Sequence, residues 1–189
     1  MRSADVVAKD ILGAYLIRNV NSKMKAVVKI VEVEAYMGVK DKGSHSYGGR
    51  ITERNKTMYL EGGVFYVYKI YGIHYCLNVV VNKKDMPHAV LIRAVEPIKG
   101  IEIIEKNRGF KENTKNLTNG PGKLSQALDI DLRFNGSNVC DKELYISEDS
   151  KVKDEQIVSA KRINIDYAEE CKDLLLRFYL KGNKFISAK

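Results

Sequence analysis

Three apolar stretches in the middle of the chain, separated by short connections, restrict the fold more than any other feature of the sequence. Residues 64–70 and 73–81 are joined only by Tyr71-Gly72, and residues 89–95 follow soon after. Strands joined by two residues pair antiparallel, and Gly readily adopts the positive φ that a tight hairpin needs. The chain is therefore predicted to contain an antiparallel sheet, with the Tyr71 side chain projecting from a hairpin tip.

The rest of the chain supplies helices and further strands. A first helix is expected after the candidate N-cap Ser3, because apolar side chains recur at helical spacing: Val7, Ile11, Leu12 and Tyr15. Further helices are predicted over Ile101–Arg108 (closed by Gly109) and 121–128, an irregular segment over 111–120, and strands over 26–36, 144–146, 162–165 and Arg177–Leu180. The dipeptide Glu96-Pro97 is expected to end the strand at 89–95.

Length and composition fit one globular domain. A chain of 189 residues is long enough for one substantial core and short for two. Its residues are 44% hydrophobic and 30% charged, which is typical of globular proteins. The predicted fold class is mixed α/β (α+β), with residues 1–189 forming a single compact domain on a curved antiparallel sheet with flanking helices.

Charge, cysteines and missing motifs narrow the function classes. The net charge of +8 is compatible with a polyanionic partner. The three cysteines form no CxxC pair, and no HExxH, Walker or GxGxxG motif occurs, so neither metal nor cofactor is expected. Asp5, Lys9 and Asp10 interrupt the N-terminus, which excludes a signal peptide, and no apolar run could span a membrane. An intracellular protein is predicted.

Tyrosine is concentrated in one part of the chain. Seven of the eleven tyrosines lie between residues 36 and 75, and there is no tryptophan. Cross-strand packing accounts for Tyr66 and Tyr75. It fits less well for Tyr36 at a strand end, Tyr68 on the face opposite Val67, and Tyr71 at the hairpin tip. Aromatic faces beside basic side chains are what proteins use to hold unstacked bases.

Two carboxylates lie next to one of these tyrosines. Alternation along the strand at 26–36 puts Glu32, Glu34 and Tyr36 on one face. The opposite face is apolar, with Val31, Val33 and Ala35. Glu34 and Tyr36 would lie about 6.6 Å apart along the strand, close enough to address one ligand. The pattern alone fits an edge strand with solvated glutamates more readily, and both interpretations stay open.

Two polar residues lie inside apolar strands. Asn78 stands in CLNVVV and Arg93 in LIRAV. A buried polar side chain without a partner costs about 1–3 kcal/mol. Either these residues face solvent, or they line an internal polar site. His45, alone in the polar loop at 38–56, is by itself weak evidence for a site.

Six sequence blocks occur in order along nearly the whole chain. They are VEVEAY (31–36), SHSYGGRITERN (44–55), FYVYKIYGIHYCLNVV (65–80), AVLIRAVEP (89–97), GPGKLSQAL (120–128) and RFYLKGN (177–183). Each block alone is weak, but together they resemble the alkyladenine (3-methyladenine) DNA glycosylase family. The resemblance implies a compact mixed α/β fold with a basic DNA-binding face and no cofactor.

The resemblance also implies the catalytic and base-binding roles. Glu34 matches the carboxylate that activates water, and Arg93 matches the arginine that helps to hold this water. Tyr36, His45 and Tyr68 match the walls around a base flipped out of the duplex. Asn78 matches the residue that crowds the exocyclic amino group of normal guanine.

The DNA contacts are expected around the hairpin. Tyr71 matches the wedge that enters the minor groove, and Arg50 and Thr52 are expected to contact DNA beside it. The chain departs from the family pattern at Asn164, where glycine is usual, and in a longer stretch at 82–88. Asn tolerates a positive φ better than most residues, so the backbone at 164 can survive the change.

The function implied is that of a monofunctional DNA glycosylase. Such an enzyme flips alkylated or deaminated purines out of double-stranded DNA and hydrolyses the N-glycosidic bond, leaving an abasic site. No obligate protein partner is expected, so the chain should act as a monomer. One alternative is a non-catalytic nucleic-acid-binding module with the same aromatic hairpin. An RNA-directed formyl- or acyl-transfer relative is a further alternative, but no folate or nucleotide site is evident.

Overall fold

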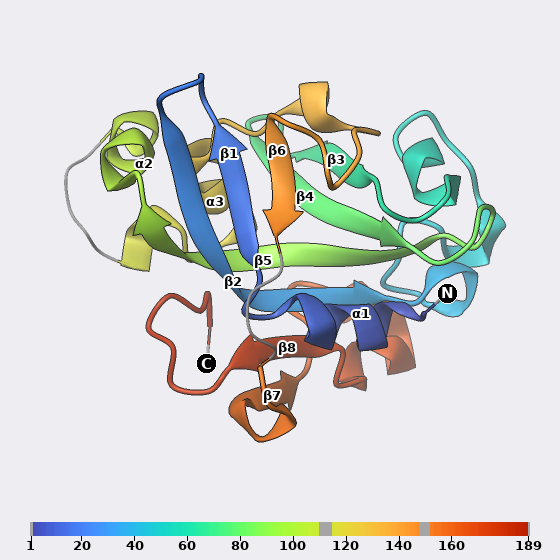
Figure 1. The fold of residues 1–189 in the computed structure, drawn as a ribbon. Coiled ribbons are helices and arrows are strands. Elements are labelled where there is room, and N and C mark those ends of the chain that lie inside the picture. Colours follow the sequence, from blue (N-terminus) through green and yellow to red (C-terminus); the bar gives the residue numbers. More distant parts are fainter. Residues whose placement is uncertain (1, 110–114, 148–151, 189) are drawn as a thin grey trace.

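One antiparallel sheet contains all eight strands found in the described residues, and it is strongly curled (Figure 1). The structure is a computed structural model that describes residues 2–109, 115–147 and 152–188. The strands are β1 (Tyr15–Asn19), β2 (Lys25–Tyr36), β3 (Phe65–Ile70), β4 (His74–Val81), β5 (His88–Lys99), β6 (Leu144–Ser147), β7 (Ile157–Ala160) and β8 (Arg177–Leu180). The helices are α1 (Ala4–Ile11), α2 (Ile101–Arg108) and α3 (Pro121–Ala127). The predicted fold class, a single compact α+β domain, is confirmed.

The two long strands β2 and β5 form the middle of the sheet. Its order is β3-β4-β5-β2-β1-β6, and β8 pairs with both β2 and β7. On the side away from β5, β2 pairs first with β1, over residues 25–29, and then with β8, over residues 32–34. Glu32 and Glu34 therefore lie on an interior strand. The interpretation of these glutamates as solvated residues of an edge strand is wrong.

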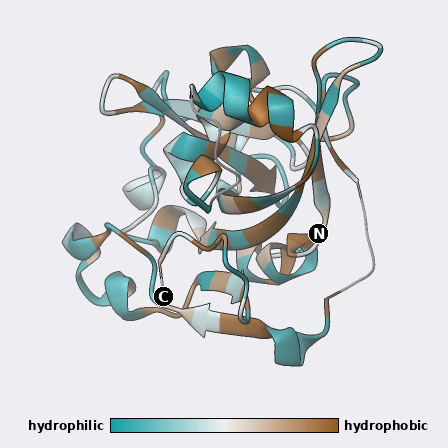
Figure 2. Cartoon of the chain, turned by 90° about the vertical axis from the view of Figure 1, so that its left-hand side faces the viewer, coloured by the Kyte–Doolittle hydropathy of each residue, from teal (hydrophilic) through white to brown (hydrophobic). Residues whose placement is uncertain are grey.

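The apolar core lies between the sheet and the helices. α1 packs on β2 and β5, and α3 packs on β4 and β5 while also contacting α2. Fully buried side chains from these elements include Ile30, Leu77, Ile92 and Leu124. Burying each such side chain stabilises the fold by about 1.5–3 kcal/mol. Figure 2 shows the apolar stretches in the interior strands and the hydrophilic ones in the outer turns. Among the described residues, no helix has the length and hydropathy needed to cross a membrane.

The central hairpin and the three predicted helices are confirmed, but the first helix is shorter than its apolar spacing suggests. It ends at Ile11, and Gly13 then adopts a φ of 86°. Tyr15, predicted to lie on the helix, begins β1 and pairs with Lys29 of β2. Glycine at a positive φ permits the sharp turn that helical periodicity alone does not reveal.

Two strand predictions near other turns are wrong. β5 does not end at Glu96-Pro97 but continues to Lys99, because Pro97 lies opposite a register shift in β2, where a missing N–H is tolerated. Residues 162–165 are a loop, and the strand of this region is β7. Asn164 has a φ of 59°, which breaks an extended backbone and which Asn tolerates. Within the predicted irregular segment, residues 111–114 lie outside the described residues.

Candidate active site

Two β-bulges in the pairing between β2 and β5 change the direction in which Val31 and Arg93 point. Register shifts lie on both sides of the Glu32–Ala94 pair, so that β2 carries one extra residue, Val31, and β5 carries one, Arg93. Bulges of this kind bend strands and are frequent beside active sites. Val31 packs with Ile186 in a small separate cluster. The predicted alternation is therefore correct from residue 32 to residue 36 but wrong at Val31.

One row of directly paired residues crosses four strands. Tyr66 of β3 pairs with Asn78 of β4, Asn78 pairs with Leu91 of β5, and Leu91 pairs with Glu34 of β2. Paired residues in a sheet point to the same face. The register therefore brings together a phenol, an amide and a carboxylate from segments that are far apart in the sequence.

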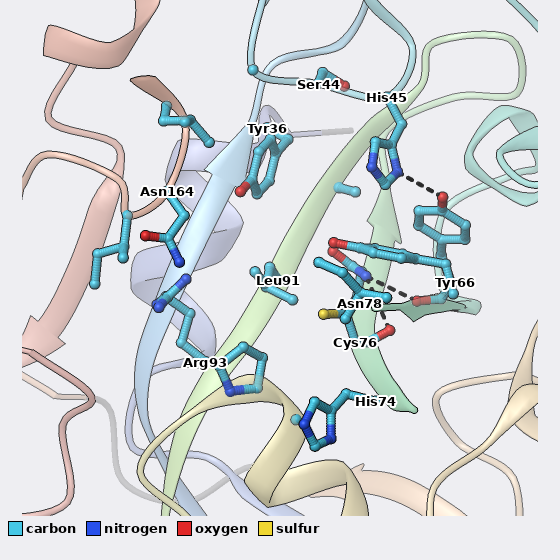
Figure 3. Close-up of a pocket in the computed structure, with 18 of the residues that line it drawn as sticks. Tyr36, Ser44, His45, Tyr66, His74, Cys76, Asn78, Leu91, Arg93 and Asn164 are labelled. Atoms are coloured by element: carbon cyan, nitrogen blue, oxygen red, sulfur yellow. Dashed lines mark hydrogen bonds between the residues drawn. The ribbon is translucent and has the colours of Figure 1, made fainter. Parts of the chain in front are cut away.

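A pocket of about 320 Å³ opens on this face. Six of the predicted site residues line it: Tyr36, His45, Tyr68, Tyr71, Asn78 and Arg93. Figure 3 shows Tyr36, Arg93 and Asn164 on one side of the pocket, with His45, Tyr66 and Asn78 across from them. The volume lies near the lower end of the range for small-ligand pockets, about 300–1,000 Å³. The pocket can accommodate one planar base.

Three rings form a cluster on one wall of the pocket. The His45 and Tyr68 centroids are 4.6 Å apart with planes at 70°, and the Tyr66 and Tyr68 centroids are 5.2 Å apart. The Tyr66 hydroxyl lies 2.9 Å from Nδ1 of His45. His45 is partly open to solvent, but burial of its ring in the pocket, helped by the charge of Arg54, lowers its pKa to about 4. His45 is therefore neutral near pH 7.

Asn78 is held rigidly in the wall. Its side chain is buried, and Nδ2 donates to the Tyr66 carbonyl at 3.1 Å and more weakly to the Cys76 carbonyl at 3.4 Å. The same Cys76 lies beneath the pocket, where burial raises its thiol pKa, so it is protonated and unreactive. These bonds hold the amide in place, because a buried amide that rotated would lose both of them.

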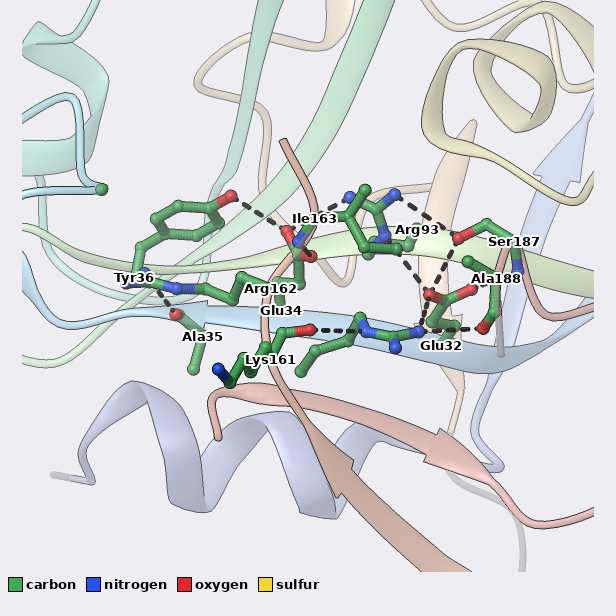
Figure 4. Close-up of polar contacts among 12 residues, drawn as sticks. Glu32, Glu34, Ala35, Tyr36, Arg93, Lys161, Arg162, Ile163, Ser187 and Ala188 are labelled. Carbon is green, nitrogen blue, oxygen red and sulfur yellow. Dashed lines mark hydrogen bonds and ion pairs between the residues drawn. The ribbon is translucent and has the colours of Figure 1, made fainter. Parts of the chain in front are cut away.

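Glu34 lies directly behind the pocket wall and is fully buried. Its Oε1 accepts the Ile163 N–H at 2.7 Å, and its Oε2 accepts the Tyr36 hydroxyl at 2.9 Å (Figure 4). Arg93 Nη1 lies 3.2 Å from the same Oε2. All three partners line the pocket, although Glu34 itself does not. A carboxylate has about four acceptor positions, so three donors leave about one for a further ligand.

Arg93 is held from behind by a second buried carboxylate. Its Nε lies 3.4 Å from Oε1 of Glu32, and its Nη2 donates to the Ser187 hydroxyl at 3.4 Å. Glu32 also accepts from Arg177 Nη1 at 3.0 Å and from the Ser187 backbone N–H at 2.5 Å. Burial disfavours the charge on Arg93, but Glu34 and Glu32 outweigh this effect and raise its pKa. The negative charges of two carboxylates thus offset the positive charges of two guanidinium groups below the pocket.

The hairpin tip lies at the rim of the pocket and is open to solvent. Tyr71 has a φ of 52° and is 78% exposed, so it projects as expected from its position, and Ile73 beside it is 73% exposed. Tyr71 also lines the mouth of the pocket. Arg50 and Thr52 lie outside the lining, on the neighbouring loop, where Arg50 is exposed and Thr52 half-buried.

Sequence reasoning missed the residue that organises this loop. The buried Asn55 donates through Nδ2 to the carbonyls of His45 and Arg50, both at 2.8 Å, and accepts the Thr52 N–H at 2.7 Å. The amide thereby ties the pocket histidine to the two predicted DNA contacts. Tyr66 packs against Met58, Val80 and Ala89, as expected of a packing residue, but sequence reasoning missed that its hydroxyl is also the hydrogen-bond partner of His45.

The segment after β7 was also missed. Ile163, Asn164, Ile165 and Tyr167 close one side of the pocket. Hydrophobic alternation suggested a strand in this segment. The only sequence feature that set it apart was Asn164, which stands where glycine is usual in the family. Among the described residues, no group of three His, Cys, Asp or Glu side chains lies close enough together to hold a metal ion.

The sequence is similar to known proteins along nearly its full length. The sequence model of the methylpurine-DNA glycosylase family matches residues 1–184. A protein of Clostridium novyi (strain NT) is 53% identical, covering 97% of this chain and 92% of the relative. A protein of Natranaerobius thermophilus is 52% identical, covering 98% and 94%. Both relatives carry the name "Putative 3-methyladenine DNA glycosylase".

Proposed function

Because the chain belongs to the methylpurine-DNA glycosylase family, we propose that it releases 3-methyladenine and other damaged purines from double-stranded DNA. The reaction is hydrolysis of the N-glycosidic bond, and its products are the free base and an abasic site. None of the described residues that line the pocket is a lysine, so no amine nucleophile is available from them, and the enzyme is monofunctional and leaves the strand intact. It acts as a monomer.

The observation that carries this proposal is the arrangement around Glu34. A buried carboxylate stands behind a base-sized pocket, and each of its three donors lines that pocket. The one remaining acceptor position on Glu34 suits a water molecule that enters between Tyr36 and Arg93. A binding protein would gain nothing from such a carboxylate, because burying a charge is unfavourable and DNA is itself an anion.

The pocket holds the flipped base between aromatic rings. Tyr36 forms one side and Tyr68 with His45 the other, and a positively charged alkylated purine gains cation–π attraction between such rings. Extrusion costs a few kcal/mol and is easiest for weakened base pairs. Tyr71, exposed at the rim, enters the space that the base leaves and delays its return.

The bond breaks with positive charge developing on the sugar. The pair of electrons in the bond between C1′ and the base nitrogen leaves with the base, and the water oxygen bonds to C1′. Glu34 stabilises the sugar cation and takes the proton of the attacking water. A cationic alkylated purine departs as a neutral base and needs no general acid. The neutral His45 fits this requirement, since it has no proton to spare near pH 7.

The direct test is base release from alkylated DNA. The purified chain is incubated with methylated duplex DNA, and free bases are separated by chromatography while abasic sites are scored by alkaline cleavage. We expect free 3-methyladenine and strand breaks only after alkali. Binding without release would establish the alternative, a non-catalytic nucleic-acid-binding module. Breaks without alkali would contradict the monofunctional mechanism.

A further inference from the structure

A buried ion pair outside the pocket connects three of the segments that form it. Arg162 Nη1 and Nη2 lie 2.5 Å and 2.7 Å from the two carboxylate oxygens of Asp41. The side chains of Asp41 and Arg162 are 1% and 0% exposed. Neither residue lines the pocket. Two-pronged contact between a guanidinium and a carboxylate fixes the orientation of both groups.

Arg162 supports the pocket wall at Tyr36 from outside. Its guanidinium lies 4.8 Å from the centroid of the Tyr36 ring, and Nη1 donates to the Ala35 carbonyl at 3.1 Å. Because Tyr36 lines the pocket and Arg162 does not, the guanidinium covers the ring away from the base-binding space. The arginine therefore fixes both the backbone before Tyr36 and the position of its ring.

Asp41 holds the loop that carries the opposite wall. Its carboxylate accepts the N–H groups of Met37 and Gly43, both at 2.9 Å. Burial alone would raise the pKa of Asp41, but Arg162 and these N–H groups outweigh it and keep the pKa below its usual value. The loop passes so close that a Cβ added at Gly43 would lie 3.0 Å from Arg162 Nη2. His45 follows two residues later.

The third segment begins at Arg162 itself. The next residue, Ile163, donates its backbone N–H to Oε1 of Glu34 at 2.7 Å. Arg162 Nη2 also donates to the Cys171 carbonyl at 3.2 Å, at the far end of the same segment. The chain between these points closes one side of the pocket. Fixing Arg162 therefore fixes the donor that orients the carboxylate.

We propose that the Asp41–Arg162 pair positions Tyr36 and the Ile163 N–H around Glu34, so that it controls the rate of the chemical step without touching DNA. The inference rests on the proposed glycosylase function. Glu34 needs its three donors at once to aim its remaining acceptor position at water. Two of those donors, Tyr36 and Ile163, depend directly on Arg162. Misplacement of a reacting group by about 1 Å can slow a reaction about 100-fold.

A second ion pair supplies a matched control. Lys42 Nζ lies 2.6 Å from Glu169 and 3.0 Å from Glu170, so it joins the same loop to the same later segment. Both glutamates are exposed, and none of the three residues lines the pocket. Lys42→Met removes a contact between the two segments without affecting the supports of Tyr36 or Ile163.

The experiment compares Arg162→Lys and Asp41→Asn with Lys42→Met. Single-turnover excision of a damaged purine gives the maximal rate and the half-saturating enzyme concentration, and hydrogen exchange reports on the Ile163 amide. We expect Arg162→Lys to lower the maximal rate about 10- to 100-fold, with half-saturation changed less than about twofold and faster exchange at Ile163. Lys42→Met should leave all three unchanged. Asp41→Asn, similar in size to the wild-type side chain, is the second variant if Arg162→Lys fails to fold.

The outcomes separate this inference from the function on which it rests. A maximal rate no lower than that of Lys42→Met would overturn the positioning role. So would a parallel loss of rate, affinity and melting temperature, which marks a purely structural pair. If the wild-type chain releases no base, the proposed function fails. Unchanged exchange at Ile163 in both Arg162→Lys and Asp41→Asn would then still overturn the positioning of this N–H by the ion pair, and faster exchange would support that positioning.

Discussion

The floor of the pocket and its rim differ in how far their side chains are exposed to solvent. Below the pocket, Glu34, Arg93 and their charged neighbours are nearly inaccessible to solvent, and each is held by hydrogen bonds or ion pairs. At the rim, the side chains of Tyr71 and Ile73 are more than 70% exposed. The contrast fits the proposed division between a catalytic floor and a DNA-contacting rim. Chemistry requires charges preorganised away from water, whereas a groove of DNA can be entered only by side chains that no other part of the protein covers.

The two regions also differ in what stabilises them. Buried charges are tolerated only with full pairing, and removing one partner of such a pair typically costs about 3–5 kcal/mol. A substitution in the floor is therefore expected to destabilise the fold as well as to slow excision. The rim contributes little to the core, so its substitutions should affect DNA binding while leaving the fold intact.

The largest effect is expected at Glu34. Glu34→Gln keeps the shape of the side chain but removes the charge that, in the proposed mechanism, stabilises the sugar cation and accepts the proton of water. We expect excision to fall about 1,000-fold, with affinity for lesion DNA nearly unchanged. Abasic-site formation and gel-shift affinity are measured on the same duplex. Normal excision by this variant would remove Glu34 from the mechanism.

For Tyr71 at the rim, we expect DNA binding to change more than excision, which is the opposite of the result expected at Glu34. Tyr71→Ser should weaken binding of a fully paired lesion duplex about 10-fold, because aromatic stacking contributes about 1–3 kcal/mol. Excision from a mispaired or bulged context should change less, since extrusion is then easy. Tyr47→Ser, at another exposed tyrosine, is the control. Equal loss on both substrates would place Tyr71 in the pocket or the fold instead.

The sequence predicted the rim better than the floor. Tyr71 follows from a two-residue turn, which is local information, and the hairpin was correct to within a residue at each end. Whether Glu34 is buried depends on which strands flank β2, and β8 is more than 140 residues away in sequence. Hydrophobic alternation cannot distinguish an edge strand from an interior one when the polar face carries paired charges.

The elements that failed did so for specific reasons. Tyr15 continued a helical spacing that Gly13 had already ended, and Ile163 and Ile165 alternated like a strand although Asn164 has a positive φ. The extra residue at Arg93 depends on how β2 and β5 pair with each other, so no local sequence pattern predicts it. The Asp41–Arg162 pair joins residues 121 positions apart, beyond any local pattern. Only the resemblance to a known family linked Glu34 and Arg93 before the fold was known.

A smaller effect, on selectivity, is expected at Asn78. An aromatic pocket has little means of rejecting normal guanine, because every base has a π-face. The Asn78 amide is held by the Tyr66 and Cys76 carbonyls, so we expect it not to move aside for the 2-amino group of guanine. Asn78→Ser should raise release of undamaged guanine relative to 3-methyladenine about fivefold. Asn183→Ser, at an asparagine that does not line the pocket, is the control, and an unchanged ratio would make Asn78 a structural amide.

The smallest effect concerns the pH response of His45, at the boundary between floor and rim. Its pKa of about 4 lies below the value of 6.5 for an unperturbed histidine. The unfolded chain therefore binds the proton first as pH falls. The contribution of neutral His45 to folding is complete above pH 6.5 and is lost as pH falls from 6.5 towards 4.

Between pH 5 and 8 the folded protein should keep His45 neutral. The ratio of the wild-type excision rate to that of His45→Gln should thus stay constant within about twofold across this range. The reason is electrostatic: a cationic imidazolium beside Tyr68 would repel an alkylated purine that already carries positive charge, whereas a neutral ring accepts it. Excision by both proteins is measured at pH 5, 6.5 and 8. A ratio that changes with a midpoint near pH 6.5 would show that His45 titrates as if it lay on the open rim, and it would then belong to that side of the comparison.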